Sequence, residues 1–452
     1  MKQAQASFNP QPILSGAAPH VVVGGGLAGL TTAAYLAQAG EPVMVLERSR
    51  QLGGRAASQM KDGFILNQGP HALYLSSLGL PVLRELGVAV KGHKPKYSPT
   101  GLLLHHRVHT LPALLDGELW SWGDRWEFLR VRHAINKLDP AQVRSQTVRG
   151  WAEAHIRRPR VRELFYTLVR VQTYANLPDY QSMAAVVRQW QRAEAGGVWY
   201  LDGGWQTLVD GLCDLAAASG ALIRTGVRVE AVTRGAAGPR VHLENGETVE
   251  AATVTLAVEP QVARRLLVEA SRISLDGWLP TGPAVRAAVL DLGLAAMPTL
   301  KWPFALGVDR PLYYSVHSTV AALAPAGGGL VHLAKYLAEN DEDPAAVRAE
   351  LEQAMDLLQP GWRQQVLHQR FLPNMIVANA VDLPDGVGVS RARPVAPDYR
   401  NVFAAGDWVA VDAMLADAAL GSGQQAAQLA LAVSRAAAPV GVAQSLAEAV
   451  VA

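Results

Sequence analysis

The sequence lacks several features that would define a function by themselves. Its 452 residues include a single cysteine, Cys213, which excludes an intramolecular disulfide framework and a cysteine-based metal site. No stretch reaches the ~18 uncharged apolar residues of a membrane-spanning helix, and residues 1–18 lack the apolar run of a secretion signal. These absences predict a cytoplasmic protein, soluble or peripheral to a membrane, that has no metal site.

The chain as a whole also lacks a large excess of positive or negative charge. It has 41 Lys and Arg against 39 Asp and Glu, so no global attraction to nucleic acid is expected. Residues 120–200 are the exception, with 13 Lys and Arg against 7 Asp and Glu. Segments such as WSWGDRWEFLRVRH mix tryptophans with arginines, which predicts peripheral membrane contact through the 120–170 region. The alternative is a solvated helix face with its tryptophans in the core.

Three glycines near the N-terminus form the first positive signal. Gly24, Gly26 and Gly29 lie between two apolar, β-branched segments at 20–23 and 43–47, so the pattern predicts a strand, a glycine turn, a helix and a second strand. In such a unit the glycines permit a tight turn, close approach of a pyrophosphate and helix packing on the strand. Glu47 ends the second strand, where a carboxylate can accept from ribose hydroxyls. These residues predict a dinucleotide site and leave NAD and FAD open.

The next segment, Arg50 to Ala56, reads RQLGGRA and resembles the second signature of glutathione-reductase-like flavoproteins. The chain is similar to the superfamily that contains phytoene desaturases, protoporphyrinogen oxidases and flavin amine oxidases. This resemblance implies FAD as the cofactor. It implies that Gly53, Gly54 and Arg55 run past the pyrophosphate and flavin, and it adds Arg48 to the cofactor-binding residues.

The C-terminal segment FAAGDWVAVDAMLADAALGSGQQAA resembles the closing motif of the same superfamily. By that resemblance Gly406 and Asp407 lie near the ribityl and phosphate region. Leu420, expected at the start of the last helix, directs its backbone N–H toward the flavin C2 carbonyl, where a helix N-terminus stabilises negative charge. Val229 is expected beside the adenine. The motif lacks the cysteine of covalent flavoproteins, so we expect non-covalent FAD.

The positions of these motifs predict an α/β fold with a Rossmann-like, glutathione-reductase-like FAD-binding domain assembled from 1–103, 195–270 and 390–452. The insertions 104–194, mainly helical, and 271–389 are expected to form a second, α+β substrate domain. Because each insertion leaves and re-enters the first domain, the flavin is expected at the junction, facing an apolar cavity walled by both.

The substrate side is less well defined. His71, Tyr313 and Tyr314 are the candidate substrate-facing residues, with one tyrosine expected in the cavity and the other in the core, because neighbouring side chains on a strand point to opposite faces. Where amine oxidases of the superfamily carry a lysine, this chain has Arg286, and Lys301 follows downstream. A guanidinium does not replace an amine, which disfavours amine oxidation. No catalytic base is assigned, since flavin itself accepts the hydride.

The favoured function is FAD-dependent dehydrogenation of an apolar small molecule, polyene-like or isoprenoid-like, by hydride transfer to flavin N5. Oxygen or a quinone is the expected electron acceptor. The alternatives are an amine or porphyrinogen oxidase, a non-redox flavin isomerase, and a flavin-free lipid-binding chaperone. The intact glycine motifs and Asp407 disfavour the last of these.

Overall fold

The structure is a computed structural model that describes residues 18–110, 119–339 and 343–437. Segment 1–17, in which we expect no export signal, lies outside the described residues, as does the chain from 438 onward. Within the described ranges, no helix combines the length and the apolarity needed to cross a bilayer. Nor do the described side chains include a cluster of three or more histidine, cysteine or acidic residues placed to hold a metal ion.

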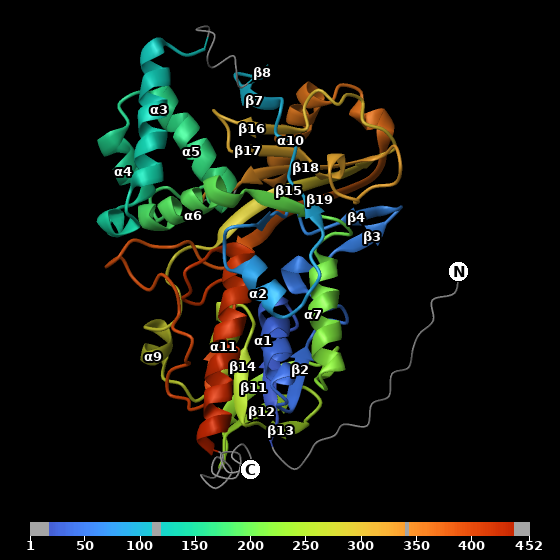
Figure 1. Ribbon diagram of the computed structural model, residues 1–452, viewed down its shortest axis with the longest axis vertical. Helices are drawn as coiled ribbons and strands as arrows, with labels where there is room; N and C mark the ends of the chain where they lie inside the picture. Colours follow the sequence, from blue (N-terminus) through green and yellow to red (C-terminus); the bar gives the residue numbers. More distant parts are fainter. Residues whose placement is uncertain (1–17, 111–118, 340–342, 438–452) are drawn as a thin grey trace, which may run out of the picture.

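A five-stranded parallel sheet forms the core of the lower half of the molecule (Figure 1). Its strands come from three separated parts of the chain and are ordered β10-β2-β1-β14-β20. They are β1 His20–Val23, β2 Val43–Glu47, β10 Leu222–Thr225, β14 Thr253–Leu256 and β20 Val402–Ala404. The sheet confirms the α/β class predicted from the sequence.

Both faces of this sheet are covered, which explains why β1 and β2 are apolar and buried over almost their whole length. Val22 packs toward the helices, whereas Val21 and Val23 pack toward a small antiparallel sheet on the other face. The helices are α1 Leu27–Gln38, α2 Gly79–Glu85, α7 Gln206–Ala218 and α11 Leu415–Ala437. The other layer contains β11 Val229–Arg234, β12 Pro239–Leu243, β13 Thr248–Glu250, α8 Pro260–Leu266 and α9 Arg272–Asp276.

A seven-stranded, mostly antiparallel sheet dominates the upper half (Figure 1). In sheet order its strands are β19 Val366–Ala378, β15 Val285–Leu294, β18 Gly329–Tyr336, β17 Leu312–Val316, β16 Phe304–Gly307, β7 Thr100–Leu104 and β8 Arg107–Thr110. Helix α10, Pro344–Leu358, packs Leu351 and Leu358 against one face.

Four helices that follow β8 in the chain form a compact insert with its own core beside the seven-stranded sheet. They are α3 Trp122–Lys137, α4 Val148–His155, α5 Pro159–Thr173 and α6 Met183–Gly196. Smaller elements connect the halves: β3 Gln59–Lys61 with β4 Phe64–Leu66, and β9 Val198–Leu201 between β5 Leu73–Tyr74 and β6 Gly92–His93.

Three predicted domain boundaries need correction. The boundary at 103/104 falls inside β7, which pairs with β16 and therefore belongs to the seven-stranded sheet. The boundary at 194/195 falls in the last turn of α6. The second insertion begins later than 271, because Leu275, Trp278 and Leu279 pack in the core around the parallel sheet. Sequence patterns place elements well, but which core a short connecting helix joins is decided by tertiary packing.

Candidate functional site

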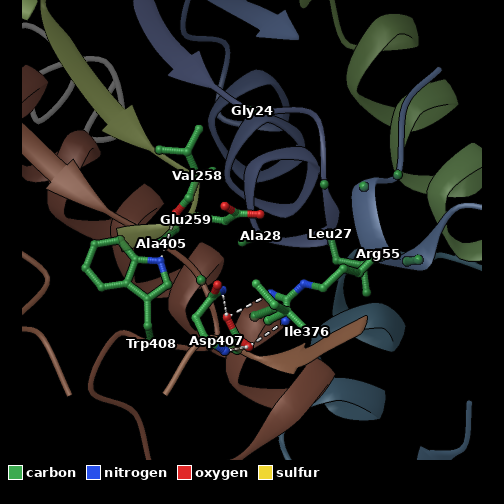
Figure 2. Close-up of a pocket in the computed structure, with 18 of the residues that line it drawn as sticks. Gly24, Leu27, Ala28, Arg55, Val258, Glu259, Ile376, Ala405, Asp407 and Trp408 are labelled. Atoms are coloured by element: carbon green, nitrogen blue, oxygen red, sulfur yellow. Dashed lines mark hydrogen bonds and ion pairs between the residues drawn. The ribbon is translucent and has the colours of Figure 1, made fainter. Parts of the chain in front are cut away.

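A cavity of about 600 Å³ lies between the glycine turn after β1 and the seven-stranded sheet (Figure 2). Its volume is typical of small-molecule and cofactor sites. The structure brings most of the predicted site residues together in its lining. These are Gly24, Gly26, Glu47, Arg48, Gly53, Gly54, Arg55, His71, Val229, Gly406 and Asp407.

The glycine turn has the geometry that a bound pyrophosphate requires. Gly24 has a φ of +108°, and a Cβ there would lie 2.3 Å from the Ala257 carbonyl oxygen. A Cβ on Gly29 would lie 1.9 Å from the Gly24 oxygen, so Gly29 permits helix packing rather than lining the cavity. At Gly26 the nearest atom would be 3.9 Å away, so the protein leaves room on this side of the loop. The first turn of α1 faces that room with backbone N–H groups that have no intrahelical partner.

The second glycine pair is joined directly to the first. Gly53 N–H donates to the Gly25 carbonyl at 2.7 Å, and Gly53 itself has a φ of +110°. Glu47 stabilises the same turn, since its carboxylate accepts from Gly25 N–H and Ser49 N–H, each at 2.7 Å. Each oxygen of Glu47 retains a further lone pair, and the side chain lines the cavity with Arg48 and Val229. This end of the cavity fits an adenosine ribose.

An ion pair that the sequence analysis did not foresee lies in the middle of the cavity. Arg55 donates to both oxygens of Asp407 at 2.8 Å (Figure 2). Asn379 donates two further hydrogen bonds to this carboxylate, at 2.7 and 3.0 Å. Burial alone would raise the pKa of Asp407, but Arg55 and Asn379 hold that pKa below its usual range. Asp407 is 2% exposed and Arg55 39% exposed, so the guanidinium is the partner that remains accessible from the cavity.

The N-terminus of α11 reaches the cavity, but not at the predicted residue. The helix begins at Leu415, and its first-turn residues Leu415, Ala416 and Asp417 line the cavity. Leu420 is fully buried in the second turn and does not line the cavity, so its predicted role at the helix start is wrong. The expected helix terminus is present five residues earlier, with a buried carboxyl, Asp417, in its first turn.

Asp417 accepts a hydrogen bond from Gly79 N–H at 2.8 Å. Burial raises the pKa of this carboxyl to about 7. The group therefore changes its charge close to neutral pH, and its side chain lines the cavity.

The far end of the cavity is mostly apolar and aromatic. His71, Tyr74, Tyr174 and Trp205 line it together with Met375 to Val377 of β19. His71 Nδ1 lies 3.0 Å from the Gly69 carbonyl oxygen, and burial lowers the pKa of the ring. Its ring centroid lies 5.0 Å from that of Trp205.

Neither Tyr313 nor Tyr314 lines the cavity, which corrects the expectation that one of them would. The two side chains do point to opposite faces of β17. Tyr314 packs against α10 and accepts from Gln359 at 2.8 Å, whereas Tyr313 packs behind Tyr174 with ring centroids 6.4 Å apart. Tyr174, a residue that sequence reasoning missed, takes the expected place of Tyr313.

A buried polar cluster supports the segment that carries His71. Asp291 of β15 accepts from His332 Nδ1 at 2.6 Å and from Arg370 Nε at 3.0 Å, with Asp291 and His332 both fully buried. Burial would raise the pKa of Asp291, but His332 and Arg370 hold it below its usual range. Arg370 also donates to the Asn67 carbonyl, just before the His71 turn. The cluster therefore fixes one wall of the cavity.

Several other side chains are placed away from the cavity. Arg286 donates to Asn374 at 3.0 Å, Lys301 is exposed, and neither residue lines the cavity. Cys213 is half-buried on α7 and also lies outside the lining, which agrees with a flavin that is not attached through a thioether.

Some lining residues carried no recognisable signal in the sequence. Asn379 lies in no motif, and Tyr174 reaches the cavity because it ends α5 in the left-handed conformation, with a φ of +58°. Trp408, which directly follows Asp407, could have been found from the closing motif. Its indole donates to the Val258 carbonyl at 2.8 Å (Figure 2). This hydrogen bond connects the closing motif to the segment that follows β14.

Residues 27–431 match the sequence model of the family described as flavin containing amine oxidoreductase. The chain is similar to a carotenoid 3,4-desaturase of Haloarcula japonica, with 28% identity over 295 residues that cover 55% of this chain and 57% of the relative. It is also similar to polyamine oxidase 2 of Arabidopsis thaliana, with 26% identity over 61% of this chain and 56% of that protein. The chain spans about half the length of the curated relatives that it matches.

Solved structures show the same fold at low identity. An oxidoreductase from Methanosarcina mazei has a TM-score of 0.72 and 17% identity, covering 91% of this chain and 100% of that chain. Cyclohexylamine oxidase from Brevibacterium oxydans has a TM-score of 0.69 and 16% identity, covering 92% and 99%. The resemblance inferred from the motifs, the two-domain α/β fold and the flavin cofactor are thereby confirmed.

Proposed function

This chain belongs to the family of flavin-containing amine oxidoreductases, and on that premise we propose that it is an FAD-dependent dehydrogenase of a largely apolar small molecule. The observation that carries the proposal is the lining of the cavity end at His71. Aromatic and aliphatic side chains dominate it, and no lysine lines the cavity within the described residues. Such a surface favours a polyene-like or isoprenoid-like substrate over a charged one.

The residues present would hold FAD along the length of the cavity. The first turn of α1 would bind the pyrophosphate, Glu47 the ribose, and the Arg55–Asp407 pair the region between phosphate and flavin. When bound, FAD supplies the hydride acceptor. The N-terminus of α11 stabilises negative charge at the flavin end, and the apolar wall excludes water and positions the substrate.

The test is anaerobic mixing of the purified protein with candidate substrates while the visible absorption of the flavin is followed. Polyene and isoprenoid hydrocarbons are expected to bleach the flavin, and a polyamine and a cyclic amine serve as the comparison. Bleaching by an amine but not by any polyene would contradict the proposal and favour the amine-oxidising relatives. After a substrate has bleached the flavin, oxygen is readmitted or a quinone is added. The substance that restores the visible absorption faster is the better electron acceptor.

A further inference from the structure

The first two turns of helix α3 carry their side chains in an inverted arrangement, whereas its later turns bury Val131 and Ile135. Asp124 and Glu127 face the protein and are buried, whereas Trp122, Trp126 and Leu129 are 82%, 67% and 62% exposed. The three apolar residues recur at spacings of four and three, so they form one stripe along the helix. A surface helix normally does the opposite, with its apolar stripe toward the core and its charges outward.

The inward carboxylates are fully engaged, which fixes the helix in this orientation. Asp124 forms a capping box with Ser121 and an ion pair with Arg158 at 3.4 Å. Glu127 accepts from the backbone N–H groups of Arg157 and Arg158 at 3.0 and 2.9 Å, at the start of α5. Rotating α3 to hide its tryptophans would remove these hydrogen bonds, so the exposed stripe is built into the fold.

Basic side chains predominate around the stripe, and one of them, Arg132, is paired with Glu194 of α6 at 2.8 Å. The charged side chains that α3 exposes are all basic, namely Arg130, Arg132 and Lys137. The adjoining start of α5 exposes Arg157 and Arg160, and the guanidinium of Arg125 lies 4.8 Å from the centre of the Trp122 ring. Tryptophan combined with arginine suits the interface between water and anionic headgroups, where the ring sits at the headgroup level.

We propose that the α3 face, consisting of Trp122, Trp126, Leu129, Arg130, Arg157 and Arg160, docks on an anionic phospholipid surface. The stripe would enter the headgroup region, and the arginines would contact phosphates. Figure 1 shows α3 at the end of the molecule remote from the parallel sheet, so the cofactor-binding half does not obstruct this contact.

One helix connects this face to the cavity. Helix α5 begins beside α3 at Pro159 and ends at Thr173, directly before Tyr174, which lines the cavity. Its 15 residues span about 22 Å. The inference does not depend on the proposed function, because vesicle binding is measured without any substrate.

The experiment is co-sedimentation of the full chain with vesicles of phosphatidylcholine, with and without phosphatidylglycerol. We expect the chain to bind the anionic vesicles, and we expect this binding to weaken as the salt concentration is raised. Trp122→Ser combined with Trp126→Ser is expected to weaken partitioning at least ~10-fold, because two apolar side chains no longer leave water. The matched control is Ile273→Ser combined with Leu300→Ser, two positions that are 86% and 73% exposed elsewhere and should leave binding unchanged.

Circular dichroism and the thermal midpoint establish that each variant is folded. The proposal is overturned if the chain does not bind anionic vesicles, or if both double variants bind as the unaltered chain does. It is also overturned if the tryptophans instead mediate self-association, seen as a dimer by sedimentation that the Trp variant abolishes while vesicle binding persists.

Discussion

At the residue scale, Glu47 connects cofactor binding to the shape of the glycine turn. Its carboxylate accepts from Gly25 N–H and Ser49 N–H, so it holds the turn and also faces the cavity. Glu47→Ala is expected to weaken FAD binding by roughly 10- to 100-fold, since hydrogen bonds to a charged acceptor contribute about 1.5–3 kcal/mol each. Flavin fluorescence titration measures the change. Glu153→Ala, at an exposed position on α4, is the control, and equal affinity of the two variants would refute the role of Glu47.

A second prediction at this scale concerns the contribution of Arg55 to stability, because its partner Asp407 is buried. Removing the guanidinium leaves the carboxylate with Asn379 alone, so Arg55→Met is expected to lower the free energy of unfolding by about 1–3 kcal/mol at pH 7. The folded-state pKa of Asp407 is depressed, so the ion pair stabilises the fold above about pH 4 and this stabilisation is lost as the pH falls through the folded pKa.

Urea unfolding of the flavin-free protein at neutral and acidic pH measures this effect. The penalty of Arg55→Met should shrink as the pH falls below about 4. Arg48→Met, at an exposed arginine of the same cavity, should cost little at any pH. A penalty for Arg55→Met that does not change with pH would show that the ion pair is not its cause.

At the scale of elements, the two glycine motifs could be predicted because their geometry is local. Each turn depends on a few adjacent residues, because Gly24 and Gly53 both have a positive φ that glycine adopts readily. The start of α11 could not be predicted in the same way. The sequence analysis expects the helix to start at Leu420, whereas the helix starts at Leu415. Gly421 and Gly423 lie inside it, where a Cβ on Gly423 would lie 2.5 Å from the Ala28 carbonyl oxygen. Gly423 serves the packing of α11 on α1, and Gly421 lies against Leu78 at the start of α2, so both glycines have a tertiary cause.

The first turn of α11 carries a testable pH dependence through Asp417. Its folded pKa of about 7 lies above the ordinary value, so the unfolded chain loses the proton first and stability falls as the pH rises from about 4 to 7. Asp417→Asn keeps an acceptor for Gly79 N–H and removes the charge. We expect it to raise the free energy of unfolding by about 2–4 kcal/mol at pH 8 and to change it little at pH 4.

Chemical unfolding of the native chain and the Asn variant across that range measures the difference. Asp276→Asn, at a surface aspartate on α9, is the control and should show no such rise. If Asp417→Asn destabilises the protein equally at both pH values, the carboxyl is ionised and paired, and the inferred environment is wrong.

At the scale of the whole molecule, the sequence order of the cofactor motifs was enough to infer that three distant segments meet. Glu47, Val229 and Asp407 do line one cavity, because parallel strands carry their following turns to the same edge of the sheet. The substrate end could not be inferred in this way. It depends on the turn at Tyr174 and on the register of β19, and neither feature leaves a local pattern in the sequence.

The visible spectrum of the purified protein tests whether this cavity holds FAD without a covalent bond. We expect a flavin spectrum, with FAD passing into the filtrate when the protein is denatured and filtered. A colourless protein that does not bind added FAD would show that the cavity is not an FAD site, and a flavin that stays with the denatured chain would show that the bond is covalent.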